Sequence, residues 1–380
     1  MKLPKSLQEK LNIRKENNAL RILKTPSDLI DFSSNDYLGF AKNEIIFDKV
    51  HQLLQDKNLI QNGATGSRLL SGNHALFFET ETYISQFHQS EAAILYNSGY
   101  DANVGFFSAV PQRNAIILFD EFSHASIRDG IQMSLAKAYK FKHNDLEDLE
   151  KILKRYQTAS VEIYIVTESV FSMDGDSPDL EKLVQLSEKY KAYLVIDEAH
   201  ALGVISNPET SSGEGLVQSL QLQDKIFARI MTFGKALGCH GAVILGSESL
   251  KEYLINFSRS LIYTTALSPH AVATILIAYQ ELAVSQKLIQ KLQDTANYFN
   301  SIASQFELST PNASAIKSIE IPGNEKVKKV AAFLNQKGFD VKPILSPTVA
   351  EGQERLRFCM HSYNTNAEID QVLAILKNHL

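Results

Sequence analysis

Residues 226–238, with the sequence IFARIMTFGKALG, place a lysine between two apolar runs. The run Ile226–Met231 leads into Lys235, and a second apolar run, Ala242–Leu245, follows it. Both runs have the length and composition of buried strands. Lysine is usually a solvated surface residue, so a lysine between two buried strands needs a partner or a chemical role. One such role is a Schiff base with a carbonyl cofactor, although a charged surface loop explains the residue as well.

Strand-like and helical segments alternate ahead of this lysine. The predicted strands cover residues 92–96, 115–119, 138–141, 161–167 and 192–196. This order predicts an α/β fold with a largely parallel sheet and helices on both faces. Ligands bind such sheets beyond the carboxyl ends of the strands. Asp120, Glu168, Asp197 and Lys235 each follow a predicted strand, so we expect them at that edge.

Capping signatures mark the starts of two helices. Asn144, with Glu147 three residues later, predicts a helix over residues 144–156 that begins with Asn144 as its N-cap. Thr365, with Glu368 three residues later, predicts a capping box at the start of the last helix of the chain.

The chain of 380 residues is long enough for a large domain with a smaller one attached. We predict an N-terminal arm over residues 1–45 and a large cofactor-binding domain over residues 46–275. A small α/β domain is predicted over residues 276–380, where strand and helix patterns resume. The boundary between the two domains is expected inside a long helical region at 270–306.

The composition limits the partners and the compartment. With 44% hydrophobic and 21% charged residues and a net charge of -5, the chain is unlike a general nucleic-acid or anionic-membrane binder. Its two cysteines, Cys239 and Cys359, suggest neither a disulfide framework nor a zinc motif. No apolar run of about 18 residues occurs, and residues 1–18 lack a signal-peptide core. We therefore expect a cytoplasmic protein with no nucleic-acid, membrane or metal partner.

Three further groups of residues fit one cofactor. Asp197 follows a buried strand, where a carboxylate is costly unless it is paired, for example with a protonated ring nitrogen. Gly99 lies in a strand–turn–helix segment of the kind that binds phosphate, although an ordinary turn is the alternative. Pyridoxal phosphate needs such an acid, a phosphate site and a lysine. His124 could cover the ring of this cofactor or simply form a local hydrogen bond at a helix start, and His200 could reach its phenolic oxygen.

Taken together, these motifs resemble those of the α-oxoamine synthases, a family of fold-type I pyridoxal-phosphate enzymes. The motifs that carry the resemblance occur in the expected order: Ser33-Ser34-Asn35-Asp36-Tyr37-Leu38-Gly39, Ser98-Gly99-Tyr100, Ser123-His124-Ala125-Ser126, Phe171-Ser172-Met173-Asp174-Gly175-Asp176, Asp197-Glu198-Ala199-His200, Gly213-Glu214-Gly215, Thr232-Phe233-Gly234-Lys235 and Ile262-Tyr263-Thr264-Thr265. Pro347-Thr348 and Arg355-Leu356-Arg357 extend it towards the C-terminus. The resemblance implies a large domain with a mostly parallel sheet flanked by helices, and a smaller C-terminal α/β domain.

The resemblance also implies how pyridoxal 5'-phosphate is held. Lys235 would form the Schiff base, Asp197 would pair with the pyridinium nitrogen, and His124 would stack on the ring. Ser172 and His200 would contact the ring oxygen or nearby substrate. The phosphate would lie against Gly99, Tyr100 and Thr232 of one subunit and against Thr264 and Thr265 of its neighbour, which implies a homodimer with shared active sites.

Substrate positions follow from the same resemblance. Asn35 and Arg357 match positions near the amino-acid carboxylate, Arg21 and Thr348 match positions that contact the acyl substrate, and Glu168 lines the cavity together with His124. The reaction implied is a decarboxylating condensation of an amino acid with an acyl thioester. Overall pattern and length are most similar to family members that join L-alanine to a pimeloyl thioester in biotin biosynthesis.

Several alternatives remain at this point. Other members of the family join glycine to an acetyl thioester, or make aminolevulinate or a palmitoyl-serine product. The sequence does not separate coenzyme A from an acyl carrier protein as the carrier of the acyl group. A non-catalytic pyridoxal-phosphate protein is disfavoured, because Lys235, Asp197 and His124 are all present and no DNA-binding extension is visible. A dehydrogenase is disfavoured because no Gly-x-Gly-x-x-Gly follows the first strand.

Overall fold

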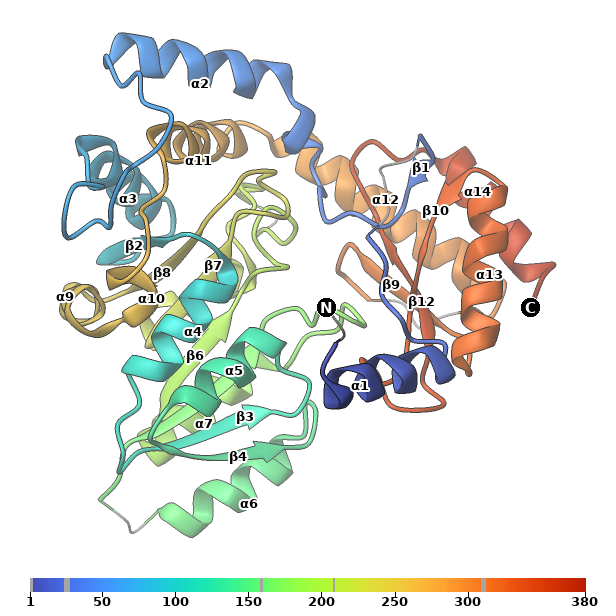
Figure 1. Ribbon diagram of the computed structural model, residues 1–380, viewed down its shortest axis with the longest axis horizontal. Coiled ribbons are helices and arrows are strands. Elements are labelled where there is room, and N and C mark those ends of the chain that lie inside the picture. The colour runs from blue at the N-terminus through green and yellow to red at the C-terminus, as the bar shows by residue number, and fades with distance from the viewer. Residues whose placement is uncertain (1–2, 24–27, 158–159, 208, 309–311) are drawn as a thin grey trace. The chain divides into compact units, whose positions relative to one another are not determined.

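The computed structural model describes residues 3–23, 28–157, 160–207, 209–308 and 312–380 (Figure 1). The chain forms two compact units. Unit 1 contains Met1–Ser34, Met173–Gly175 and Leu292–Leu380, and unit 2 contains Asn35–Ser172 and Asp176–Lys291. The division into an arm and two domains remains a prediction. Among the described helices, none is both long and apolar enough to cross a membrane.

Unit 2 is built on a seven-stranded sheet. Its strands, in their order across the sheet, are β2 (Ala92–Tyr96), β8 (Ala242–Gly246), β7 (Ala228–Thr232), β6 (Tyr193–Asp197), β5 (Ile163–Glu168), β3 (Ile116–Asp120) and β4 (Lys137–Phe141). The five strands from β7 to β4 are mutually parallel, and β8 runs antiparallel to both of its neighbours. The prediction of a mostly parallel α/β sheet is therefore confirmed.

Helices cover both faces of this sheet (Figure 1). Alternate residues of β3 show this, because side chains along a strand point to opposite faces. Ile117 packs in a cluster with Phe106 and Ile127, whereas Ile116 packs in another cluster with Leu149. The described helices that lie wholly in unit 2 are α2 (Glu44–Asp56), α3 (Ala75–Phe87), α4 (Gly99–Ala109), α5 (Ala125–Met133), α6 (Leu146–Tyr156), α7 (Leu180–Tyr190), α8 (Leu216–Ser219), α9 (Glu248–Phe257), α10 (Arg259–Ile262) and α11 (Pro269–Leu282). Two short 3-10 turns, η1 (Phe40–Lys42) and η2 (Gln223–Lys225), also belong to this unit.

The start of α6 differs from the prediction by one residue. Asp145, not Asn144, is the N-cap, and its side chain accepts the backbone N–H of Asp148 at 2.9 Å. Asn144 is engaged elsewhere, because its side-chain amide donates to Asp176 at 2.7 Å and its backbone N–H donates to Asp120 at 2.9 Å. A capping signature in sequence does not reveal such distant partners.

Unit 1 has two small sheets of its own. A parallel pair joins β1 (Ile30–Asp31) to β10 (Phe339–Asp340), and an antiparallel sheet has the order β11 (Lys342–Ile344), β12 (Arg355–Cys359) and β9 (Ile316–Glu320). The helices are α1 (Lys5–Glu16), α12 (Gln286–Gln305, in this unit from Leu292 on), α13 (Asn324–Gln336) and α14 (Asn366–Lys377). The capping box predicted at Thr365 and Glu368 is present at the start of α14.

A buried ion pair fixes the chain just after β6. Arg229 on β7 donates Nε to Glu198 Oε2 at 2.8 Å, and both side chains are almost completely buried. The guanidinium also donates to the backbone carbonyls of His88 and Glu214, and Glu198 Oε1 accepts the backbone N–H of Val217. A buried ion pair is tolerated when its remaining hydrogen-bonding groups are satisfied in this way. The residue that precedes Glu198 is therefore held at a fixed place on the sheet edge.

Candidate active site

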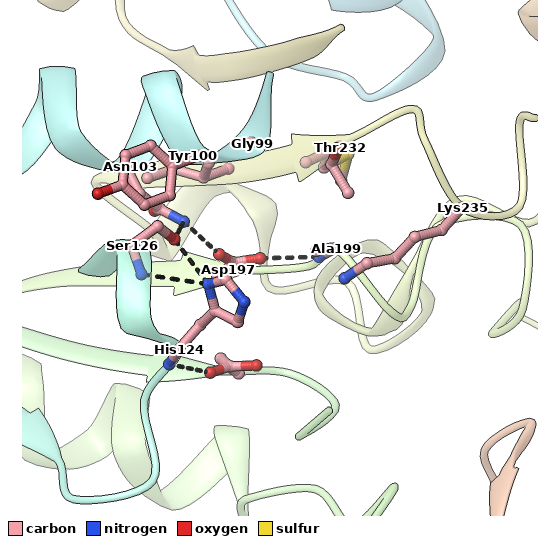
Figure 2. Close-up of a pocket in the computed structure, with 12 residues that line it drawn as sticks. Gly99, Tyr100, Asn103, His124, Ser126, Asp197, Ala199, Thr232 and Lys235 are labelled. Carbon is pink, nitrogen blue, oxygen red and sulfur yellow. Dashed lines mark hydrogen bonds between the residues drawn. The ribbon is translucent and has the colours of Figure 1, made fainter. Parts of the chain in front are cut away.

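A cavity of about 150 Å³ lies at the carboxyl edge of the sheet in unit 2 (Figure 2). The residues that line it are Gly99, Tyr100, Asn103, His124, Ser126, Glu168, Asp197, Ala199, Ile230, Met231, Thr232 and Lys235. Three of the four residues expected at this edge are thus brought together. The fourth, Asp120, does not line the cavity but accepts a hydrogen bond from His143 at 2.9 Å.

Asp197 ends β6 and points into this cavity (Figure 2). Its residue is only 6% exposed, so its carboxylate needs strong partners. Oδ1 accepts the backbone N–H of Ala199 at 2.9 Å, and Oδ2 accepts the side-chain amide of Asn103 at 2.8 Å. Each oxygen of a carboxylate has a further lone pair, so Asp197 can still accept a hydrogen bond from a protonated ring nitrogen.

The N-terminus of α4 forms a site suited to phosphate. Ser98 is the N-cap, and its side chain accepts the N–H of Asp101 at 3.0 Å. The N–H groups of Gly99 and Tyr100 open the helix and have no acceptor within it, which makes them donors for an anion. A Cβ on Gly99 would lie 3.0 Å from Cβ of Thr232, so glycine keeps this turn close to the threonine. The Tyr100 hydroxyl donates to Asp129, which leaves only the backbone of this residue for the phosphate.

His124 makes the local hydrogen bond considered from the sequence, and its stacking on a cofactor ring remains a prediction. It is the N-cap of α5, where its Nδ1 accepts the N–H of Ser126 at 3.2 Å and lies 2.8 Å from the Ser126 hydroxyl. Its ring still lines the cavity. Desolvation lowers the pKa of His124, the charge of Lys235 adds to this, and Asp197 opposes it. The imidazole is therefore neutral at neutral pH.

Glu168 is a second carboxyl group in the cavity, only 2% exposed. Burial and the nearby charge of Asp197 raise the pKa of Glu168 to about 8, against the opposing charge of Lys235. Its Oε1 accepts the backbone N–H of His124 at 2.6 Å. Glu168 is therefore mostly protonated at neutral pH and can donate a hydrogen bond into the cavity, without a second full negative charge beside Asp197.

His200, Ser172 and Asn35 do not line the cavity. His200 follows β6 and is buried, with its Nδ1 2.8 Å from the hydroxyl of Tyr37. The same hydroxyl lies 3.2 Å from Oδ1 of Asn35, so these three side chains form one polar group. Ser172 lies beyond the end of β5 and is half-buried. The cofactor and substrate contacts proposed for these residues remain predictions.

Thr264 and Thr265 lie beside the phosphate turn of their own chain. The side-chain amide of Asn97 donates to Thr264 Oγ1 at 3.1 Å and to the carbonyl of Thr265 at 2.8 Å. Asn97 directly precedes Ser98, the N-cap of α4. The contact of the two threonines with a neighbouring subunit remains a prediction.

Arg21, Thr348 and Arg357 belong to unit 1. Arg21 and Thr348 are exposed, and the backbone N–H of Thr348 donates to Leu345 at 2.8 Å. Arg357 is half-buried on β12, opposite Ser318. Their substrate contacts also remain predictions.

Two residues in the site had no role assigned from the sequence. Asn103 lies one turn after Gly99 in α4, and Ser126 lies two residues after His124 in α5. Both are buried and both line the cavity. The spacing from Gly99 to Asn103 is a signal that could have been used, because residues four apart share a helix face.

Comparison with known proteins identifies the family. The model of the class I and II aminotransferase family matches residues 27–376. The chain belongs to this family. It is 37% identical to the 8-amino-7-oxononanoate synthase of Emericella nidulans, in an alignment that covers 99% of this chain and 95% of that protein. These similarities place it among the α-oxoamine synthases, which are acyl-transferring enzymes of fold type I.

Solved structures agree with this placement. The 8-amino-7-oxononanoate synthase of Francisella tularensis matches with a TM-score of 0.79 and 29% identity, over 92% of this chain and 97% of that one. A serine palmitoyltransferase structure with pyridoxal phosphate matches with a TM-score of 0.89 and 25% identity, over 99% and 96% of the two chains. Pyridoxal phosphate is accordingly the cofactor of this enzyme.

The residues of the cavity fit this cofactor. Lys235 extends towards Asp197 across the cavity, so an amine and an acid face the same space (Figure 2). The turn at Gly99 would offer backbone donors to the phosphate, and Thr232, whose hydroxyl here donates to the Gly241 carbonyl at 3.3 Å, lines the same space. His124 supplies a neutral ring at the side of the cavity.

Proposed function

We propose that the enzyme condenses L-alanine with a pimeloyl thioester to give 8-amino-7-oxononanoate, carbon dioxide and the free thiol, as a step of biotin biosynthesis. The observation that carries this proposal is the 37% identity to a synthase of that name over nearly the whole of both chains. The cavity supports it, because Lys235, Asp197 and a phosphate site are the parts that such a condensation requires.

Pyridoxal phosphate, when bound, supplies an electron-withdrawing ring that stabilises negative charge on the α-carbon of an amino acid. Lys235 would hold the aldehyde carbon of the cofactor, and its Nζ would take the proton from that α-carbon. Asp197 would keep a proton on the ring nitrogen, and His124 would cover the ring. Neutral Glu168 would donate a hydrogen bond to an oxygen of the substrate without repelling the substrate carboxylate.

The main alternative activity is that of a serine palmitoyltransferase. Its structures match the backbone with a higher TM-score than the Francisella tularensis synthase, 0.89 against 0.79. Sequence identity favours the synthases: among the solved structures it is 29% for the Francisella tularensis synthase against 25% for the transferase, and it reaches 37% for the Emericella nidulans enzyme. Because one fold serves several substrates, we give the sequence comparison more weight than the backbone match.

A product assay tests the substrates. With pyridoxal phosphate present, we expect L-alanine and pimeloyl thioester to give 8-amino-7-oxononanoate by mass spectrometry. Glycine with acetyl thioester, and serine with palmitoyl thioester, should react with a kcat/KM lower by at least about tenfold, since a pocket fitted to one side chain discriminates by that order. Parallel reactions with coenzyme A and with acyl carrier protein as carriers identify the acyl donor. A preference for glycine or serine would refute the proposed substrates.

We also propose a homodimer whose subunits share their active sites. Large apolar side chains are exposed near the phosphate turn, among them Leu70 at 84% and Tyr263 at 72%. The loop of Leu70 contacts the segment after Tyr263, where Ala266 donates its N–H to Gly66 at 2.9 Å. Exposed apolar surface of this kind is typical of subunit interfaces. Sedimentation velocity should show a dimer, and a monomer at micromolar concentration would contradict this proposal.

A further inference from the structure

We propose that Asn103 and Ser126 are positioning residues that together fix the tautomer of His124 and the orientation of the Asp197 carboxylate in the cofactor site. They form an unbroken chain of hydrogen bonds between the two (Figure 2). Asn103 Nδ2 lies 2.8 Å from Asp197 Oδ2 and 3.0 Å from Ser126 Oγ, and Ser126 Oγ lies 2.8 Å from His124 Nδ1. This proposal depends on the binding of pyridoxal phosphate but not on which amino acid and thioester the enzyme uses.

The direction of each hydrogen bond follows from Asn103. Its amide nitrogen must face Asp197, because the amide oxygen in that place would meet a carboxylate oxygen with no hydrogen between them. The two hydrogens of Nδ2 then serve Asp197 and Ser126. Ser126 Oγ accepts one of them, which leaves its own hydrogen for His124 Nδ1.

His124 is thereby restricted to one neutral tautomer. Its Nδ1 receives the hydroxyl of Ser126 at 2.8 Å and the backbone N–H of the same residue at 3.2 Å. A nitrogen that accepts two hydrogen bonds has no room for a hydrogen of its own, so the ring carries its hydrogen on Nε2. A neutral ring avoids like-charge repulsion where it covers a cofactor ring that is itself protonated.

The charged groups around His124 do not by themselves select one of its two neutral tautomers. Burial lowers the pKa of His124, Asp197 and Asp129 raise it, and Lys235 and Arg128 lower it. Glu168, on β5, faces the backbone N–H of His124 and is largely neutral. With opposing charges on both sides, the fixed direction of the hydrogen bonds selects the tautomer.

The buried side chain of Asn103 destabilises the fold in a way that an apolar side chain at this position would not. It is 2% exposed, and within the described part of the chain its Oδ1 has no hydrogen-bond partner. Leaving a buried carbonyl oxygen unpaired is unfavourable, and an apolar side chain in α4 would not incur it. The function of this residue therefore lies in its Nδ2 group, which holds Asp197 and orders Ser126.

The test uses the full-length protein labelled with 15N-histidine, in the absence of added cofactor. Long-range 1H–15N spectra report which ring nitrogen carries the hydrogen, and the signal of His124 is identified by its loss in His124→Gln. We expect the Nε2–H tautomer in the unchanged protein. Ser126→Ala should give a mixture of tautomers and raise the titration midpoint of His124 by at least about half a pH unit. Ser126→Thr, which keeps the hydroxyl, should restore the original spectrum.

Asn103→Leu tests the other end of the chain. We expect it to weaken the binding of pyridoxal phosphate by about tenfold, measured by equilibrium dialysis, because Asp197 loses a donor to its carboxylate. If this variant does not fold, as judged by circular dichroism, Asn103→Ser takes its place with the same expected direction. Ser108→Ala, in the same helix, is the control and should leave the spectrum and the affinity unchanged.

An unaltered His124 tautomer and midpoint in Ser126→Ala would overturn the proposal, and so would unchanged cofactor affinity in a folded Asn103 variant. Neither measurement uses alanine or a thioester. A failed product assay would therefore leave this proposal standing, and failure of this proposal would leave the assignment of substrates untouched.

Discussion

Lys235→Ala should lose turnover by at least about 10⁴-fold, with the cofactor no longer attached covalently to the protein. The reason is that one amine would serve both as the attachment point of the aldehyde and as the base for the α-proton, and general acid–base catalysis alone contributes roughly 10²–10⁴-fold. The amine also faces Asp197 across a cavity of about 150 Å³, and among the described residues that line this cavity Lys235 is the only lysine. Product formation and the visible absorbance of the cofactor-loaded protein both measure the loss.

Lys154→Ala is a matched control, because this lysine is exposed on α6 and pairs with Glu150 one turn away. It should retain normal turnover. Borohydride reduction of the unchanged enzyme, followed by peptide mass mapping, should place the cofactor on the peptide that contains Lys235. Turnover of Lys235→Ala within tenfold of the unchanged enzyme, or a reduced adduct on another lysine, would show that the attachment site is wrong.

The arrangement of the sheet edge could be predicted because chain order and burial decide it. Strands that are buried on both faces read as continuous apolar runs, and β5 is buried along its whole length. Once the strands are parallel, their carboxyl ends meet at one edge, so Glu168, Asp197 and Lys235 come together although they are far apart in sequence. The positions of the strand ends and the order of the strands in the chain are enough to predict that these three residues share the site.

The hydrogen bonds within the site could not be predicted in the same way. Asn103 contacts Asp197, which is 94 residues away, and this depends on how α4 packs against the end of β6. The neutral state of Glu168 likewise depends on the nearby charge of Asp197 as well as on burial, and that charge is not visible in the local sequence of Glu168. The N-cap of α6 is Asp145 rather than the predicted Asn144, because the Asn144 side chain donates to Asp176, which is 32 residues away.

Asp197→Asn is the second variant with a large expected effect. The amide has nearly the same shape as the carboxylate but carries no charge, so the protonated ring nitrogen of the cofactor would lose its anionic partner. Removing one member of a buried charge pair costs about 3–5 kcal/mol, which corresponds to roughly 10²–10⁴-fold in kcat if the proton on the ring is needed at the transition state. Steady-state kinetics at saturating alanine and thioester measure this loss.

The same substitution also disturbs the surroundings of residue 197. Asn103 Nδ2 and the backbone N–H of Ala199 both donate to Asp197, and an amide nitrogen at residue 197 would oppose one of these donors. We therefore expect weaker binding of pyridoxal phosphate together with the lower kcat, whereas Asp224→Asn on the exposed turn η2 should change neither. A kcat for Asp197→Asn within threefold of the unchanged enzyme would mean that the cofactor ring does not need a negative partner at this position. Reduced affinity with unchanged kcat would limit Asp197 to binding, because only interactions that strengthen in the transition state raise kcat.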